Sequence, residues 1–232
     1  MSAIPNSVLV VAAHPDDEVL GCGGTIARLT DEGRAVHVLI LAEGVTSRAE
    51  VRDRSGNSEE LSALGKSAAS ANAILGSASL KICDFPDNRM DSVDLLDVIK
   101  VIEAEVARHS PFMVLTHHRS DVNIDHSVIH DAVIAACRPQ PGHPVRQLMF
   151  FEVASSTEWR PGASARGFAP NCFYDIDKHL ARKLAALEAY ASEMRPFPHP
   201  RSVQAVEHLA RWRGASAGYS AAEAFEIGRM LV

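Results

Sequence analysis

An apolar run at residues 8–13, VLVVAA, ends in the polar segment HPDDE at residues 14–18. A fully apolar run of this length, rich in valine, is typical of a parallel β-strand that is covered on both faces. Three carboxylates this close together repel one another unless a positive charge lies among them. The segment therefore predicts a buried strand that leads directly into a cation-binding turn.

Apolar runs and helical patterns alternate along the rest of the chain. Further strands are expected at residues 36–42, 80–83, 112–116, 147–153 and 171–175. Helices are expected at residues 25–33, 91–109, 127–137, 176–194 and 202–215, and another is expected to end before Gly76. This alternation predicts an α/β fold with a Rossmann-like, mainly parallel sheet and helices on both faces. Neither a repeat nor a linker interrupts it, so we expect one domain over residues 1–232.

The composition limits the partners and the cellular location that we expect for this protein. A net charge of −6 over 232 residues argues against a nucleic-acid groove or a polybasic membrane surface. The N-terminal segment lacks the positive region of a signal peptide, and no segment reaches the roughly 20 apolar residues of a membrane span. We therefore expect a soluble cytoplasmic protein. The widely spaced cysteines are expected to be free thiols of a reducing compartment: Cys22, Cys83, Cys137 and Cys172.

The glycines after the first strand raise the alternative of a dinucleotide-binding turn. The segment LGCGGT at residues 20–25 does not match G-x-G-x-x-G. Three carboxylates in this turn would also repel a pyrophosphate at the helix N-terminus. A dinucleotide site is therefore disfavoured.

A metal site explains the acidic turn better. Ligands of parallel sheets bind beyond the carboxyl ends of the strands, where both HPDDE and HHRSDVNIDH (residues 117–126) are expected. Catalytic zinc takes three His or carboxylate ligands and leaves one position for water. Because Pro15 stiffens the turn, His14 and Asp17 can point at one centre while Asp16 projects elsewhere, as suits a general base. Capping of the following helix by the acids is the alternative.

A third ligand has to come from elsewhere among the 11 histidines. His126 opens the helix after the fourth strand, at the same edge of the sheet, and is the strongest candidate. His130 follows one turn later, but the segment HSVIH lacks the glutamate of a zincin motif, so we expect a structural or outer role for it.

HPDDE followed by glycines, with a later NIDH that opens a helix, resembles the PIG-L/LmbE-like family of zinc-dependent N-deacetylases. The resemblance implies a Rossmann-like fold and removal of acetyl groups from N-acetylglucosamine units attached to diverse aglycones. It implies that Zn²⁺ is held by His14, Asp17 and His126. It also implies that Asp16 is the general base, which takes a proton from the attacking water and passes it to the leaving amine.

The chain departs from the family pattern at one position. Many members read H-P-D-H, and the first histidine, oriented by the aspartate, assists the transition state. Here Asn123 stands in its place, while Asp125 and His126 are retained. Asn123 can donate a hydrogen bond to an oxyanion but cannot carry a proton. Three histidines are candidates to replace the missing one: His117, His118 and His199.

Three functions remain open at this point. The leading hypothesis is deacetylation of an N-acetylated amino sugar, with Asp16, Asn123 and Asp125 as catalytic residues. The second is hydrolysis of a different amide, such as a thiol conjugate, and the third is a non-catalytic metal- or sugar-binding module. Asn123 favours a module, whereas the retained Asp16 argues against it. A serine hydrolase is excluded because no G-x-S-x-G is present.

Several residues in the loops at the ligand edge are expected to contact the substrate. Arg195 and Arg201 are candidates to bind an anionic group, and a solvated helix face is the alternative for Arg54. The aglycone, the physiological divalent metal and homo-oligomerisation stay open. The predicted substrate-binding set is Arg54, Asn88, Arg89, His118, Arg195 and His199.

Overall fold

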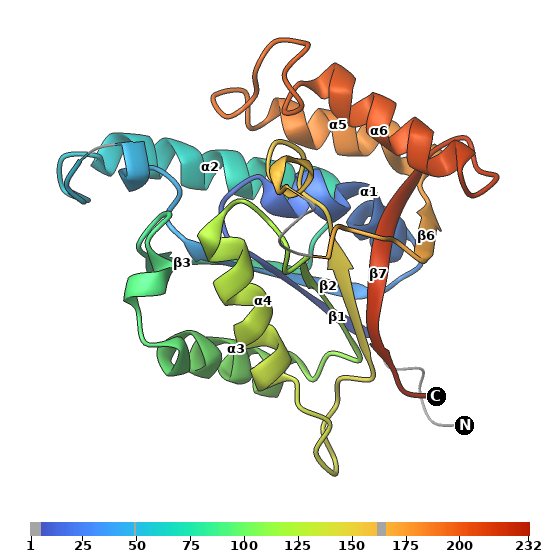
Figure 1. Ribbon diagram of the computed structural model, residues 1–232, viewed down its shortest axis with the longest axis horizontal. Coiled ribbons are helices and arrows are strands. Elements are labelled where there is room, and N and C mark those ends of the chain that lie inside the picture. Colours follow the sequence, from blue (N-terminus) through green and yellow to red (C-terminus); the bar gives the residue numbers. More distant parts are fainter. Residues whose placement is uncertain (1–5, 49, 162–165) are drawn as a thin grey trace.

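A seven-stranded sheet forms the centre of the protein (Figure 1). The computed structural model describes residues 6–48, 50–161 and 166–232. The strand order is β3-β2-β1-β4-β5-β7-β6. Strands β1 to β5 pair in parallel, while β7 runs antiparallel to both β5 and β6. The strands are β1 (Ser7–Ala12), β2 (Ala35–Ala42), β3 (Ser79–Phe85), β4 (Met113–His117), β5 (Gln147–Phe151), β6 (Cys172–Asp175) and β7 (Ala222–Met230).

Helices cover both faces of the sheet, as the sequence predicted (Figure 1). One face carries α1 (Asp17–Asp31), α2 (Ser58–Leu75), α5 (Leu180–Glu188) and α6 (Val203–Ala215). The other carries α3 (Leu95–His109) and α4 (Ile124–Ala136). Short 3-10 turns lie in the loops: η1 (Thr46–Arg48), η2 (Met90–Ser92), η3 (Thr157–Trp159) and η4 (Asp177–His179). No helix within the described ranges is long and apolar enough to cross a membrane.

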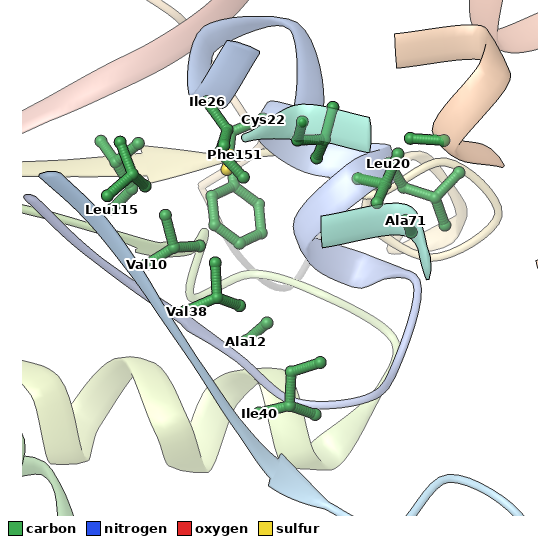
Figure 2. Packing of buried hydrophobic residues seen from close by; sticks show 14 of the residues in the cluster. Val10, Ala12, Leu20, Cys22, Ile26, Val38, Ile40, Ala71, Leu115 and Phe151 are labelled. Atoms are coloured by element: carbon green, nitrogen blue, oxygen red, sulfur yellow. The ribbon is translucent and has the colours of Figure 1, made fainter. Parts of the chain in front are cut away.

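The side chains of β1 alternate between two hydrophobic clusters. Val8 and Val10 belong to the cluster under α1, α2 and α5, whereas Leu9 and Val11 pack with α3 and α4. Figure 2 shows the first cluster, to which Val10 and Phe151 both belong. Burial on both faces accounts for the unbroken apolar run of this central strand.

Helix α1 corrects the sequence prediction, which placed its start after the glycines. It begins at Asp17 and contains Gly21 and Gly24. A Cβ atom on Gly21 would lie 2.2 Å from Phe151 Cδ2, and one on Gly24 would lie 2.6 Å from Ile176 Cδ1. The glycines therefore allow α1 to pack closely against its neighbours.

A local break in α1 falls at Cys22, whose φ of −148° is not helical. The N–H groups of Gly24 and Thr25 donate to the carboxylate of Glu223, at 2.9 and 2.6 Å. Lys183 Nζ donates to Leu20 O at 2.8 Å and also pairs with Glu223. A buried ion pair thus satisfies the backbone groups that the break exposes.

Strand β7, which contains Glu223, has no counterpart in the sequence prediction. Its sequence, AEAFEIGRM, mixes small, acidic and apolar residues without a clear period of two. Residues 176–194 were expected as one helix, yet α5 ends at Glu188. The expected helix at 127–137 begins earlier, at Ile124, because Asn123 caps it.

Candidate active site

The HPDDE turn joins β1 to α1 and is closed by its own hydrogen bonds. The backbone N–H of His14 donates to Asp17 Oδ2 at 2.9 Å, and the N–H of Asp17 donates to His14 O at 3.2 Å. These two bonds bring the His14 ring and the Asp17 carboxylate to the same side of the turn.

Helix α4 supplies the third member of this group. Asp17 Oδ2 lies 3.3 Å from His14 Nδ1 and 3.2 Å from His126 Nε2. Ligand atoms of His14, Asp17 and His126 all lie within 4.8 Å of one another. The structure therefore brings the three expected metal ligands together.

Carboxylates also face the second nitrogen of each histidine. His14 Nε2 lies 3.0 Å from Asp125 Oδ2 and 3.2 Å from Asp87 Oδ1. His126 Nδ1 lies 3.0 Å from Asp121 Oδ2. Metal-ligating histidines characteristically present their other nitrogen to a carboxylate, which fixes the tautomer and the ring orientation.

His14, Asp87 and Asp125 form a second candidate group for a metal ion. Both oxygens of Asp125 are already engaged, because the N–H of Asn88 donates to Oδ2 at 2.7 Å and the N–H of Met90 donates to Oδ1 at 3.0 Å. We therefore assign this group to the support of His14. Neither the role of Asp87 nor that of Asp121 was predicted from the sequence.

The His14–Asp17–His126 group fits a divalent cation. Asp17 Oδ1 and His126 Nε2 are buried without a hydrogen-bond partner. Burial alone would lower the pKa of His126, but the carboxylates of Asp17 and Asp121 raise it to about 9. Burial would raise the pKa of Asp17, yet His126 and His14 hold it well below its usual range. The site thus requires positive charge, and one carboxylate with two imidazoles is a donor set of zinc.

Asp16 lies next to this group without being part of it. Its backbone adopts φ of 112°, in the left-handed region, and the residue is 1% exposed. Burial raises the pKa of Asp16 well above its usual value, although the neighbouring Arg201 opposes the shift. A buried carboxylate beside a metal site is suited to exchange a proton with water.

Asn123 and Asp125 have defined structural partners. Asn123 Oδ1 accepts a hydrogen bond from the N–H of Asp125 at 2.9 Å and caps α4. Asp125 is fully buried and links His14 to the loop between β3 and α3.

His117 is the candidate replacement histidine that lies against the metal group. Its ring stacks on His126 with centroids 3.9 Å apart, and its Nε2 accepts the N–H of Ala13 at 2.8 Å. Burial lowers its pKa well below the usual value, so the ring is neutral. His130 Nδ1 lies 2.9 Å from His117 O, in agreement with the structural role expected for it.

The other two candidate histidines have partners elsewhere. His118 Nε2 lies 3.4 Å from Glu226 Oε1, on β7. His199 Nδ1 accepts the N–H of Arg201 at 3.0 Å, within the loop between α5 and α6.

The predicted substrate-binding arginines are held by groups outside the metal site. Arg54 pairs with Glu43 and Asp84 at 2.7 and 2.8 Å. Arg89 donates to Glu50 O at 3.0 Å. Arg195 donates to two carbonyls of its own loop, those of Ser192 and Met194. The arginine that reaches the site is Arg201, whose Nη1 lies 3.2 Å from Asp16 Oδ2.

Several known proteins are similar in sequence. The Escherichia coli (strain K12) protein named "uncharacterized deacetylase YaiS" is 29% identical over 191 residues, covering 80% of this chain and 90% of YaiS. A Bacillus cereus protein named "probable N-acetyl-alpha-D-glucosaminyl L-malate deacetylase 2" is 28% identical, with 80% of this chain and 83% of that protein covered. The 4-oxalmesaconate hydratase of Pseudomonas putida is 30% identical, with coverage of 83% and 76%.

Solved structures share the fold. The conserved protein TT1542 from Thermus thermophilus superposes with a TM-score of 0.74 at 28% identity, covering 99% of this chain and 97% of that one. N,N'-diacetylchitobiose deacetylase from Pyrococcus horikoshii has a TM-score of 0.75 at 19% identity, covering 97% and 84%, which shows the fold alone.

The model of the PIG-L family, described as GlcNAc-PI de-N-acetylase, matches residues 9–137, which is more than half of the chain. This match contains HPDDE and NIDH, the two segments that meet at the site. The chain therefore belongs to the PIG-L/LmbE-like deacetylase family.

Proposed function

We propose that this protein is a zinc-dependent hydrolase that removes the N-acetyl group from an N-acetylglucosamine-type amino sugar, with one domain spanning the chain. The observation that carries the proposal is Asp16, a buried carboxylate that adjoins the His14–Asp17–His126 group without joining it. A site that only bound a metal or a sugar would have no use for a free base in this position.

Zinc, when bound, would polarise the acetamide carbonyl and make a water molecule acidic enough to lose a proton near neutral pH. His14, Asp17 and His126 would hold the ion. Asp16 accepts the proton of the water whose oxygen bonds to the carbonyl carbon. Asp16 then returns that proton to the leaving nitrogen as the C–N bond breaks, which gives a free amine and acetate.

Asn123 is proposed as a hydrogen-bond donor to the oxyanion. Its Oδ1 is used to cap α4, and its Nδ2 has no hydrogen-bond partner among the residues that the structure describes. Neutral His117, stacked on His126, is the other group proposed to shape this part of the site.

The substrate contacts stay predictions. Among the predicted substrate-binding residues, Asn88 is hydrogen-bonded to the site, because its backbone N–H donates to Asp125 Oδ2. Arg54, Arg89, His118, Arg195 and His199 require a change of partner, or a substrate that extends beyond the metal group, to take this role.

One of the similar proteins is named a deacetylase and another a hydratase. The first experiment should therefore determine which class of reaction this protein catalyses. The zinc-loaded protein should be assayed for acetate release from free, nucleotide-linked and lipid-linked N-acetylglucosamine. The panel should also include a thiol conjugate carrying an amide and, for hydration, 4-oxalmesaconate.

We expect metal-dependent release of acetate from one class of N-acetylglucosamine conjugate, and that class identifies the aglycone. Turnover of the thiol conjugate or of 4-oxalmesaconate alone would replace the proposal with another amidase or with a hydratase. No turnover of any compound by protein that holds one zinc per chain would favour a binding module.

A further inference from the structure

The backbone of Asp16 is held in an unfavourable conformation by buried partners. Left-handed backbone geometry is costly for a residue with a Cβ atom and persists where the surroundings impose it. The N–H of Asp16 donates to Glu18 Oε2 at 3.1 Å. Glu18 Oε1 in turn accepts the hydroxyl of Tyr190 at 2.7 Å and the amide of Asn72 at 3.0 Å. Helix α2 and the segment after α5 therefore fix where the Asp16 side chain begins.

The end of the Asp16 side chain is held by one arginine. Arg201 Nη1 donates to Asp16 Oδ2 at 3.2 Å. No hydrogen bond to the other oxygen, Oδ1, is found within residues 6–48, 50–161 and 166–232. The contact therefore occupies one carboxylate oxygen and leaves the second free to accept a proton.

Arg201 is itself anchored by three further hydrogen bonds. Its Nε donates to Ser155 Oγ at 3.1 Å, in the loop after β5. Its N–H donates to His199 Nδ1, and its carbonyl accepts the N–H of Arg195 at 3.0 Å. The next residue, Ser202, caps α6. The guanidinium is thus held by the loop after β5, and the backbone of Arg201 is held by its own loop at the start of α6.

The loop that holds Ser155 is similarly constrained. Ser155 has φ of 67°, also in the left-handed region. The N–H groups of Ser155 and Ser156 donate to the two oxygens of Glu158, at 2.6 and 3.1 Å. Two strained residues, Asp16 and Ser155, therefore meet at the same guanidinium, and strain of this kind gathers at functional sites.

We infer that Arg201 is a positioning residue, which together with Ser155 fixes the carboxylate of Asp16 in the orientation needed to receive a proton from water. This role rests on the proposed function of Asp16. It differs from the role expected from the sequence, in which Arg201 binds an anionic group of the substrate. The two roles are separable because a positioning residue acts on kcat, whereas a substrate-binding residue acts on KM.

The test compares Arg201→Ala and Arg201→Lys with the wild-type enzyme, each loaded with zinc and assayed on the best N-acetyl substrate. Arg211→Ala is the matched control, since Arg211 pairs with Glu207 on the surface of α6. We expect kcat of Arg201→Ala to fall about 10- to 100-fold, because small misplacements of a reacting group cost up to about that much. KM should change by less than about threefold, and zinc content should be unchanged.

Rescue distinguishes a lost guanidinium from a general loss of structure. Arg201→Lys should recover part of the lost kcat, and guanidinium ion at millimolar concentration should recover part of it in Arg201→Ala. An increase in KM with unchanged kcat would overturn the inference and make Arg201 a substrate ligand.

A crystal structure of zinc-loaded Arg201→Ala supplies a readout that does not depend on turnover. We expect the Asp16 carboxylate to leave its wild-type orientation while Asp17 stays in place. An unmoved Asp16 carboxylate would contradict the inference even if the kinetic effect were present. An inactive wild-type enzyme would defeat the proposed function, whereas this structural comparison would still decide whether Arg201 orients the Asp16 carboxylate.

Discussion

The proposed zinc ligands His14 and His126 each face carboxylates outside the His14–Asp17–His126 group, which orient their rings. Asp121 illustrates this at the scale of one residue. It accepts the N–H of Asn123 and the hydroxyl of Thr157, both at 2.8 Å, and also the hydroxyl of Ser156. These bonds fix its carboxylate 3.0 Å from His126 Nδ1. Asp121 therefore holds the ring of His126, a proposed zinc ligand, from a loop outside α4.

Asp121→Asn removes the charge behind His126 while keeping the size of the side chain. We expect the zinc dissociation constant to rise about 10- to 100-fold, as is typical for loss of an outer partner of a metal ligand. Competition with a chromophoric chelator measures this dissociation constant. Asp131→Asn is the control, because Asp131 pairs with Arg119 on the exposed side of α4. Equal zinc affinities of Asp121→Asn and the wild type would remove Asp121 from this role.

The raised pKa of His126 predicts how zinc binding depends on pH. With a pKa of about 9 in the metal-free protein, His126 is protonated at pH 7 and must lose its proton before Nε2 can bind zinc. The apparent affinity should therefore rise about tenfold per pH unit for each proton released, and the contribution of His126 should level off above pH 9. Chelator competition at several pH values between 6.5 and 9.5 measures this slope. An affinity that stays flat from pH 7 to pH 9 would show that no proton is displaced.

At the scale of the element, α1 depends on close contacts with its neighbours. Gly21 faces the ring of Phe151 at a distance that leaves no room for a methyl group. Gly65, in α2, has nothing within 4 Å of the position of an added Cβ atom. Substitution by alanine should therefore change the free energy of unfolding in opposite directions at the two glycines.

Gly21→Ala should lower the free energy of unfolding by about 1–3 kcal/mol, because the methyl group overpacks the core against Phe151. Gly65→Ala should raise it by up to about 1 kcal/mol, because alanine restricts the unfolded chain and favours the helix. Urea denaturation of both variants beside the wild type measures the two changes. A Gly21→Ala variant as stable as the wild type would show that α1 can move away from β5.

The sequence predicted those elements whose signal is local. Strands β1, β2, β4 and β5 are mostly apolar, since most of their residues are buried between the helix layers. Strand β7 gave no such signal because it lies beyond the parallel part of the sheet and its outer half is partly exposed. The start of α1 was misplaced because its glycines serve contacts with Phe151 and Ile176, and neither partner can be inferred from the neighbouring residues.

In the molecule as a whole, the site combines segments that lie far apart in the sequence. HPDDE and NIDH could be assigned to one edge because the carboxyl ends of parallel strands meet there. The contact of Asp125 with His14 spans 111 positions in sequence, and that of Arg201 with Asp16 spans 185. Contacts of this range depend on how the loops close over the sheet, so the partners of Asp125 and Arg201 are revealed only by the fold.

Titration of the metal-free protein with zinc, with acetate release and bound zinc followed together, tests whether Asp16 is the base of a zinc-dependent hydrolase. It should be run on the wild type, on Asp16→Asn and on Asp97→Asn, which changes an exposed aspartate of α3. We predict that wild-type and Asp97→Asn activities rise to a plateau at one zinc per chain. Asp16→Asn should bind the same zinc with kcat lower by about 10²- to 10⁴-fold, the usual contribution of a positioned base. Full activity of zinc-loaded Asp16→Asn would remove Asp16 from the role of base, and full activity of the wild type without metal would exclude zinc-dependent hydrolysis.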